Sequence, residues 1–362
     1  PADMEALAVQ KAERVRFYMW LQWQVDRQLC AAGEAVRLIH DLAVGSDPEG
    51  ADTWIDRDAY ADSTRIGAPP DLFNPDGQDW GLPPLHPWRL RDLDYAPFID
   101  TVRATMRHAA GLRVDHVMGL MRLWWVHGDL GPRAGGYVRY PGDELLGILA
   151  LEAHRAGAFV VGEDLGTVDP AIRVALRRRG ILGYRLVLFE EAPPSRYPRL
   201  SLAAATTHDL PTVAGLWSGA DTRALEAMGR EPDRDATAAV QARVARLPGI
   251  RPGSRPGAVV DGVHSALARS PSLLAVATLD DLLLVEERPN HPGTIDEWPN
   301  WRIALPLTVD EITADPAVTR RLRRIRRRRP RRGATPASDA PVRTSPGPDG
   351  VRPTRRARGG RD

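Results

Sequence analysis

Gly111-Leu-Arg-Val-Asp-His116 alternates apolar and charged residues, a pattern typical of a short β-strand that ends in charged side chains. Side chains two positions apart on a strand share a face, so Arg113 and Asp115 point one way and Leu112 and Val114 the other. An Arg beside an Asp keeps the carboxylate ionised and oriented, which a carboxylate nucleophile needs. Taken alone, however, the stretch is explained better by a structural ion pair at a strand end.

Three more predicted strands end in an acid, namely Asp41, Glu163 and Asp209. Strands are predicted near residues 36, 112, 159, 185, 203 and 275, with helical stretches between them. Such alternation predicts parallel βα units, and in a (β/α) barrel the active site lies at the carboxyl ends of the strands. The recurring acids therefore favour a barrel over an open doubly wound sheet. No Gly-x-Gly-x-x-Gly follows these strands to support a dinucleotide site.

A complete barrel has eight strands, whereas about six are predicted here. We therefore expect an α/β fold, an incomplete TIM-type (β/α)8 barrel whose first two βα units are absent. The predicted catalytic domain covers residues 1–319, with loop and helical insertions near 44–95 and 220–270. Residues 5–32 are predicted to form a helix, with Gly33 as its C-cap.

Two stretches rich in Gly and Pro are predicted to be irregular. Residues 67–84 are expected to form a long ordered loop or a small insertion, and residues 128–141 a Gly-rich loop. Aromatic residues in and around the first stretch, such as Phe73 and Trp80, argue against disorder there.

The net charge of +2 conceals an uneven distribution. Residues 320–362 hold 16 of the 49 Lys and Arg residues and 3 of the 47 Asp and Glu residues, a net charge of +13, which leaves −11 for residues 1–319. The acidic body argues against nucleic acid as the main partner. The Arg-, Pro- and Gly-rich end is expected to be a disordered, solvated tail because it has few apolar residues. An arm attracted to RNA or to a membrane is the alternative.

Composition also restricts the class and compartment of the protein. A hydrophobic content of 43% is typical of a globular protein, and no apolar run is long enough to span a membrane. The first residues lack the basic and apolar regions of a signal peptide. Cys30 is the only cysteine, so neither a disulfide framework nor a thiolate metal site is expected. We expect a cytoplasmic protein.

Asp115, Glu163 and Asp209 are the candidate reactive groups. A glycosidic bond is broken by two carboxyl groups across the anomeric carbon, one acting as nucleophile and the other as acid and then base. A third acid can hold the sugar hydroxyls and favour a distorted ring. Metal binding is the competing use of three acids, since hard cations take oxygen ligands, but no His pair at helical spacing accompanies them.

Motifs around these acids resemble those of the 4-α-glucanotransferases, or amylomaltases, of glycoside hydrolase family 77. The motifs follow the family's order from about residue 10 to 310, and this ordered set is specific although each motif alone is weak. They are Leu112-Arg-Val-Asp-His116, Val161-Gly-Glu-Asp-Leu-Gly166, Thr207-His-Asp209, Gly67-Ala-Pro-Pro-Asp-Leu-Phe73, Gly77-Gln-Asp-Trp-Gly-Leu-Pro83, Gly136-Tyr-Val-Arg-Tyr-Pro141, Gly183-Tyr-Arg185, Pro292-Gly-Thr294 and Pro299-Asn-Trp-Arg302.

The resemblance implies a role for each acid. Asp115 matches the nucleophile, Glu163 the general acid/base and Asp209 the transition-state stabiliser. The resemblance also implies substrate-binding roles for Arg113, His208, Trp80, Asp41, Asp71 and Tyr137. Enzymes of this family use no organic cofactor, so we expect none, and no metal site is predicted.

Purely structural roles remain open for several of these side chains. Glu163 could be a solvated acid, although the preceding Val-Val-Gly favours a partly apolar setting that would raise its pKa. His208 and Asp209 could cap a helix before Pro211. Asp41 could bind sugar or only cap a strand end.

The implied reaction transfers α-1,4-glucan segments from a maltooligosaccharide donor to a glucose or maltodextrin acceptor by a retaining double displacement. Water or a sugar hydroxyl can attack the covalent intermediate. An aromatic loop such as 67–88 can hold the acceptor and exclude water. Trp80 either supports the acceptor or only packs this loop. The alternatives are an α-glucan hydrolase of the same clan and an inactive glucan-binding fragment.

Overall fold

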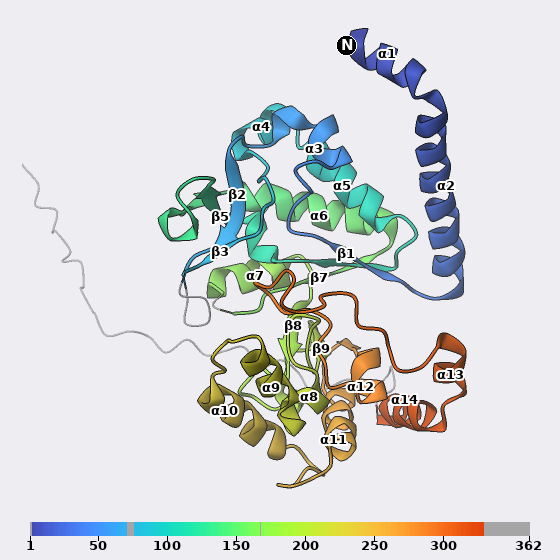
Figure 1. Ribbon diagram of the computed structural model, residues 1–362, viewed down its shortest axis with the longest axis vertical. Coiled ribbons are helices and arrows are strands. Elements are labelled where there is room, and N and C mark those ends of the chain that lie inside the picture. Colours follow the sequence, from blue (N-terminus) through green and yellow to red (C-terminus); the bar gives the residue numbers. More distant parts are fainter. Residues whose placement is uncertain (1, 71–75, 167, 329–362) are drawn as a thin grey trace, which may run out of the picture. The chain divides into compact units, whose positions relative to one another are not determined.

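Figure 1 shows the computed structural model, which describes residues 2–70, 76–166 and 168–328. Within these ranges, six parallel strands form two three-stranded sheets, ordered β1-β4-β7 and β8-β9-β10. The strands are β1 (Ile39–Leu42), β4 (Gly111–Val114), β7 (Phe159–Gly162), β8 (Gly183–Leu186), β9 (Ser201–Ala204) and β10 (Leu274–Ala275). A parallel bridge between Val161 and Leu182 joins the sheets. The prediction of six parallel strands is confirmed, and β1 and β10 are the outer strands of this arrangement.

The register of the parallel strands explains why acids distant in sequence come together. Asp41 lies opposite Arg113 in the β1–β4 pair, and Arg113 lies opposite Val161 in the β4–β7 pair. Because parallel strands end at the same edge, Asp115 after β4 and Glu163 after β7 share one edge. Asp41 differs slightly from the prediction, since it lies inside β1 and not at its end.

A four-stranded antiparallel sheet, ordered β3-β2-β5-β6, accompanies the parallel strands. Its strands are β2 (Thr64–Ala68), β3 (Gln78–Asp79), β5 (Arg122–His127) and β6 (Gly136–Arg139). The prediction of loops at 67–84 and 128–141 is therefore wrong in part. Strands β3 and β6 are short, and β2 pairs with β5, almost 60 residues away in sequence, so local periodicity gave little signal.

Helices connect the strands and occupy both predicted insertions, near 44–95 and 220–270. The α-helices are α1 (Ala2–Gln10), α2 (Ala12–Ala35), α3 (Ala51–Ile55), α4 (Pro87–Asp92), α5 (Ala96–Met106), α6 (Gly142–Ala156), α7 (Pro170–Arg178), α8 (Val213–Ser218), α9 (Ala220–Ala227), α10 (Arg234–Ala245), α11 (Pro256–Ala268), α12 (Leu279–Leu283), α13 (Val309–Ala314) and α14 (Pro316–Arg328). Short 3-10 helices are η1 (Arg57–Ala59), η2 (Val117–Leu120), η3 (Pro132–Ala134) and η4 (Pro194–Arg196).

The predicted helix over residues 5–32 is two helices, α1 and α2, and Gly33 is not its C-cap. Helix α2 continues to Ala35, and Val36 is the C-cap. A Cβ atom at position 33 would lie 2.5 Å from the backbone oxygen of His108. Gly33 therefore allows a close approach between two backbones and does not end the helix.

Two apolar clusters hold the parallel strands against helices. In the first, Leu112 and Val114 of β4 pack with side chains of α5 and α6, including Leu149. In the second, Ala203 of β9 packs with α8 and α11. Because Leu112 and Val114 occupy the helix-facing side of β4, Arg113 is left on the opposite face, as the alternation predicts.

The predicted disordered tail begins too early at residue 320, because α14 extends through Arg328. Val318 is buried, and Arg321 and Arg324 both donate to the carboxylate of Asp261 on α11. The rest of the predicted tail lies outside the described residues. Among the helices of residues 2–70, 76–166 and 168–328, none combines the length and hydropathy needed to cross a bilayer.

Candidate active site

Arg113 joins two carboxylates at the edge shared by β1 and β4. Its Nη1 donates to both carboxylate oxygens of Asp41, at 2.6 and 2.8 Å, and its Nη2 donates to Oδ1 of Asp115 at 2.7 Å. Burial lowers the pKa of the guanidinium, but the charges of Asp115 and Asp41 outweigh it and raise the pKa. The predicted contact between Arg113 and Asp115 is confirmed. One cation orients both acids.

Glu163 follows β7 directly, and backbone amides fix its carboxylate. The amide of His116 donates to Oε2 at 3.0 Å, and the amide of Leu165 donates to Oε1 at 2.7 Å. Burial is the main cause that raises the pKa of Glu163, and the charge of nearby Asp115 raises it further. A carboxyl group in this setting retains its proton more readily, as an acid catalyst must.

Asp209 lies between β9 and α8, beside His208. Its Oδ1 accepts a 2.6 Å hydrogen bond from Nδ2 of Asn290, and its Oδ2 lies 3.3 Å from Nε2 of His208. Burial raises the pKa of Asp209, but the hydrogen bonds from His208 and Asn290 outweigh it, so the pKa is lowered. The same contact raises the pKa of His208. Thr212 is the N-cap of α8, so Asp209 and His208 do not have that role.

A polar pocket of about 200 Å³ lies beside the partners of these acids. Asp41, Arg113, Tyr184 and His208 are among its lining residues. The pocket therefore extends from Asp41 and Arg113 to His208, which in turn contacts Asp209. Its charged and hydroxyl-bearing lining suits a ligand rich in hydroxyl groups.

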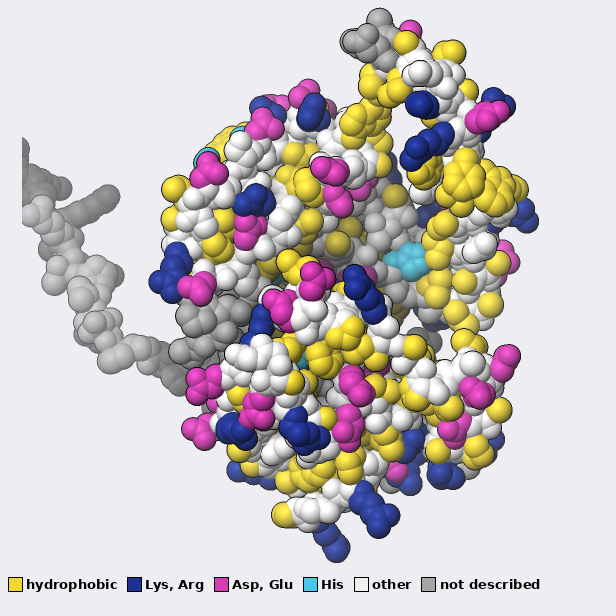
Figure 2. Space-filling view, in the orientation of Figure 1, with side chains coloured by type: hydrophobic (Ala, Val, Ile, Leu, Met, Phe, Trp, Pro, Cys, Tyr) yellow, Lys and Arg dark blue, Asp and Glu magenta, His cyan; other side chains and the backbone are white. Residues whose placement is uncertain are grey.

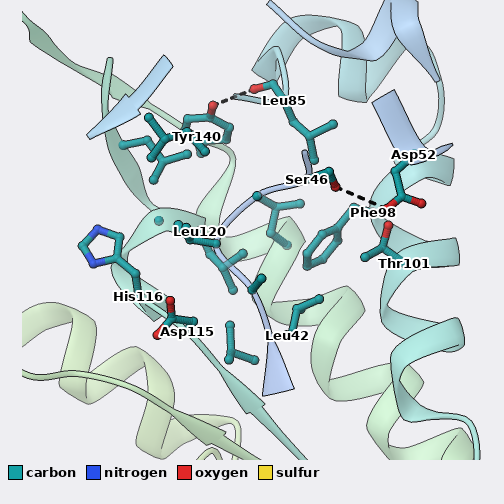
Figure 3. Close-up of a pocket in the computed structure, with 18 of the residues that line it drawn as sticks. Leu42, Ser46, Asp52, Leu85, Phe98, Thr101, Asp115, His116, Leu120 and Tyr140 are labelled. Carbon is teal, nitrogen blue, oxygen red and sulfur yellow. Dashed lines mark hydrogen bonds between the residues drawn. The ribbon is translucent and has the colours of Figure 1, made fainter. Parts of the chain in front are cut away.

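A second cavity, of about 310 Å³, has Asp115 in its lining (Figure 3). Its walls are largely apolar, with Leu42, Phe98 and Leu120 among them, and Asp115 and His116 lie at one end. Polar side chains also reach this cavity, among them those of Ser46, Asp52 and Tyr140. Asp41 lines both spaces, so the group formed by Asp41, Arg113 and Asp115 borders both of them.

The remaining predicted binding residues have different surroundings. The ring of Trp80 lies 5.6 Å from that of His116, next to Asp115, while its indole nitrogen donates to Gln78. Tyr137 is on β6 of the antiparallel sheet, where its ring packs against Trp124 and Arg122. Asp71 lies outside the described residues. Binding roles for all three stay predictions.

Sequence reasoning did not select three residues that contact this group. Asn290 and Arg288 both donate to Asp209, and the ring of Trp301 lies 5.1 Å from that of His208. The motifs Pro292-Gly-Thr294 and Pro299-Asn-Trp-Arg302 include or adjoin these residues. The position of these residues in or near two family motifs could have suggested them. The spacing of the motifs, however, could not show that this segment contacts Asp209.

The chain matches the model of glycoside hydrolase family 77, described as 4-alpha-glucanotransferase, over residues 1–308. It is 41% identical over 338 residues to 4-alpha-glucanotransferase of Mycobacterium tuberculosis, covering 84% of this chain and 47% of that protein. Its identity to 4-alpha-glucanotransferase of Haemophilus influenzae is 37%, covering 84% and 48%. The chain therefore spans about half the length of the curated relatives it matches.

The fold of the chain is also similar to that of solved structures. The chain is similar to amylomaltase from Corynebacterium glutamicum, with a TM-score of 0.80 and 35% identity, over 87% of this chain and 50% of that one. It is also similar to amylomaltase from Streptococcus agalactiae in complex with acarbose, with a TM-score of 0.74 over 89% and 65% of the two chains. The identity in that case is 20%, so this likeness concerns the fold alone.

Proposed function

Because the chain belongs to glycoside hydrolase family 77, the 4-alpha-glucanotransferases, we propose that it transfers α-1,4-glucan segments from a maltooligosaccharide donor to a glucose or maltodextrin acceptor. The main support is the contact of Arg113 with both Asp41 and Asp115, beside a Glu163 held by the amide of His116. No organic cofactor takes part in the proposed reaction.

The proposed reaction is a double displacement with retention. Asp115 attacks the anomeric carbon and forms a glycosyl ester while Glu163 gives its proton to the departing glycosidic oxygen. Glu163 then takes a proton from the acceptor hydroxyl, whose oxygen displaces Asp115. The raised pKa of Glu163 supports the first step, and the contact with Arg113 supports Asp115 as an ionised nucleophile.

Asp209 and His208 are proposed to hold hydroxyls of the reacting sugar. Asp41 and Arg113, which line the same pocket as His208, are proposed to contact it as well. An ionised Asp209 would hold its hydroxyl most tightly as positive charge develops on the ring, which stabilises the transition state. Trp80, close to His116, is proposed to support the acceptor and limit access of water. Asp71 and Tyr137 are proposed as further contacts to substrate.

The six parallel strands are proposed to be part of a TIM-type barrel of the α-amylase clan. The proposed catalytic domain is residues 1–319, with insertions near 44–95 and 220–270. The similarity to amylomaltase from Corynebacterium glutamicum supports this assignment. In such a barrel the acids would lie at the carboxyl ends of strands, where this fold places its chemistry.

The direct test is disproportionation of maltotriose by the 362-residue chain and its Asp115→Asn variant. We expect glucose and longer maltodextrins from the first, and a loss of at least about 1,000-fold in the second because the nucleophile is gone. Net reducing-end gain without longer products would identify a hydrolase. Retained maltotriose binding without turnover would identify a glucan-binding fragment and refute the transfer proposal for this chain.

A further inference from the structure

The guanidinium of Arg288 connects helix α9 to the backbone of Asp209. Its Nε donates to Oδ1 of Asp221 on α9 at 2.6 Å, and its Nη2 donates to Oδ2 of the same carboxylate at 2.5 Å. Its Nη1 donates to the backbone oxygen of Asp209 at 3.1 Å. The side chains of Arg288 and Asp221 are only 10% and 11% exposed. The Arg288 guanidinium thus makes three hydrogen bonds. Two go to the carboxylate of Asp221 on α9, and one goes to the backbone oxygen of Asp209.

The segment that carries Arg288 also reaches the carboxylate of Asp209. Asn290, two positions later, donates to Oδ1 of Asp209 at 2.6 Å. The backbone oxygen of Arg288 accepts a 3.1 Å hydrogen bond from the indole of Trp298, which fixes this segment in turn. Asp209 is therefore held at two points, its backbone oxygen by Arg288 and its carboxylate by Asn290.

Asp209 needs such support because no regular element positions it. Strand β9 ends at Ala204 and α8 begins at Val213, so Asp209 lies in the connection between them. An Arg in a planar, bidentate pair fixes a direction in space, whereas a Lys provides only a point charge. A displacement of about 1 Å at a catalytic group can reduce a rate about 100-fold.

We propose that Asp221 and Arg288 are a positioning pair that holds Asp209, and through it His208, at the polar pocket. The pair does not touch the sugar, and it acts by fixing the loop that carries the third acid. The catalytic importance of the pair rests on the proposed function. The placement of Asp209, however, can be measured without turnover.

The test is the titration of His208, followed by NMR in the full chain without ligand. The contact with Asp209 raises the pKa of His208, so a displaced Asp209 returns that pKa toward its ordinary value of about 6.5. Arg288→Lys keeps the charge but loses the planar fork, and Asp221→Asn keeps the shape but loses the anion. We expect both variants to lower the pKa of His208 relative to the unaltered protein, because the hydrogen bond to Asp209 that raises it is weakened.

Glu152→Gln is the matched control. Glu152 on α6 is also a buried carboxylate that accepts two hydrogen bonds from one Arg, Arg103 on α5. We expect this variant to leave the pKa of His208 unchanged. If Arg288→Lys also leaves it unchanged while the protein remains folded, the pair only stabilises α9 and the inference is wrong. A fall in Asp221→Asn alone would be a direct effect of the removed charge and would likewise overturn it.

The two proposals can fail separately. If the unaltered chain transfers glucan, both variants should lose about 10- to 100-fold in kcat with a smaller change in KM, because Asp209 acts mainly in the transition state. An unaltered chain that has no transferase activity would refute the proposed function. The His208 titration would still decide whether the pair positions Asp209.

Discussion

Glu163 and Asp209 are both partly buried carboxyl groups, yet their surroundings move their pKa values in opposite directions. Burial and the charge of Asp115 raise the pKa of Glu163. For Asp209, the hydrogen bonds from His208 and Asn290 outweigh burial and lower it. A pair of carboxyls with diverging pKa values is what acid catalysis beside an anionic stabiliser requires. These opposite shifts support the proposed roles of Glu163 as the acid and Asp209 as the anionic stabiliser.

The interaction of Glu163 with Asp115 gives a prediction for single residues. In Asp115→Asn the negative charge disappears, ionisation of Glu163 becomes easier, and its pKa should fall. A carboxyl-carbon NMR titration with labelled Glu would measure this. Asp143→Asn, at an exposed acid on α6 paired with Arg179, should leave the pKa of Glu163 unaltered. A constant or rising value in Asp115→Asn would contradict the proximity of the two acids.

The raised pKa of Glu163 also sets the direction of the pH dependence. In the proposed mechanism Glu163 must carry a proton to protonate the leaving oxygen, so kcat/KM should fall as pH rises through its pKa. Because that pKa is raised, the fall should begin at a higher pH than an ordinary Glu would allow. Glu163→Gln should remove this alkaline limb along with most activity toward maltotriose.

Helix α6 shows how an element's two faces divide between packing and solvent. Leu149 is fully buried in the first apolar cluster, whereas Leu151, two positions later, is 47% exposed. The helix ends at Gly157, whose φ of 64° lies in the left-handed region that glycine tolerates. Both the periodicity and the glycine that follows the helix are local features of the sequence.

These two leucines provide a matched test of the packing at the level of the element. Leu149→Ala should lower the free energy of unfolding by about 2–5 kcal/mol because it leaves a cavity among β4, α5 and α6. Leu151→Ala should change it by less than about 0.5 kcal/mol. Urea denaturation followed by circular dichroism measures both. Equal losses would mean that α6 does not face the cluster as described.

Across the whole molecule, apolar side chains are not confined to the two clusters. Helix α2 is 24 residues long and buries none of them. Its Phe17, Trp20 and Trp23 are each about half exposed, at 52%, 49% and 51%. Figure 2 shows hydrophobic side chains gathered over this helix. A contiguous apolar surface of this kind is uncommon on a soluble domain.

This surface should bind an apolar dye. Trp20→Gln with Trp23→Gln should reduce the fluorescence of added anilinonaphthalene sulfonate by about half or more, because the largest exposed apolar side chains are removed. Trp54→Gln, at an exposed Trp on α3, is the control and should have little effect. The same fluorescence in the double variant and the unaltered protein would show that the dye binds elsewhere.

The sequence by itself determined the six parallel strands and the contact between Arg113 and Asp115. Periodicity, strand-end acids and alternation are local properties, and a strand of period two leaves Arg113 and Asp115 on one face. The strands of the antiparallel sheet were not predicted because they are stabilised by pairing with other segments of the chain, which local sequence patterns do not show. The segment near Gly33 escaped it because the glycine serves a close approach to His108, a residue 75 positions later.

Only the tertiary structure decided which distant groups surround Asp209. Arg288 and Asn290 reach it from a later loop, and Asp221 on α9 holds Arg288 in turn. No spacing in the sequence encodes these contacts. The raised pKa of Glu163 depends likewise on burial and on Asp115 from another strand. Local patterns specify elements and the faces of elements, whereas electrostatic environments arise from contacts across the chain, which exist only once it has folded.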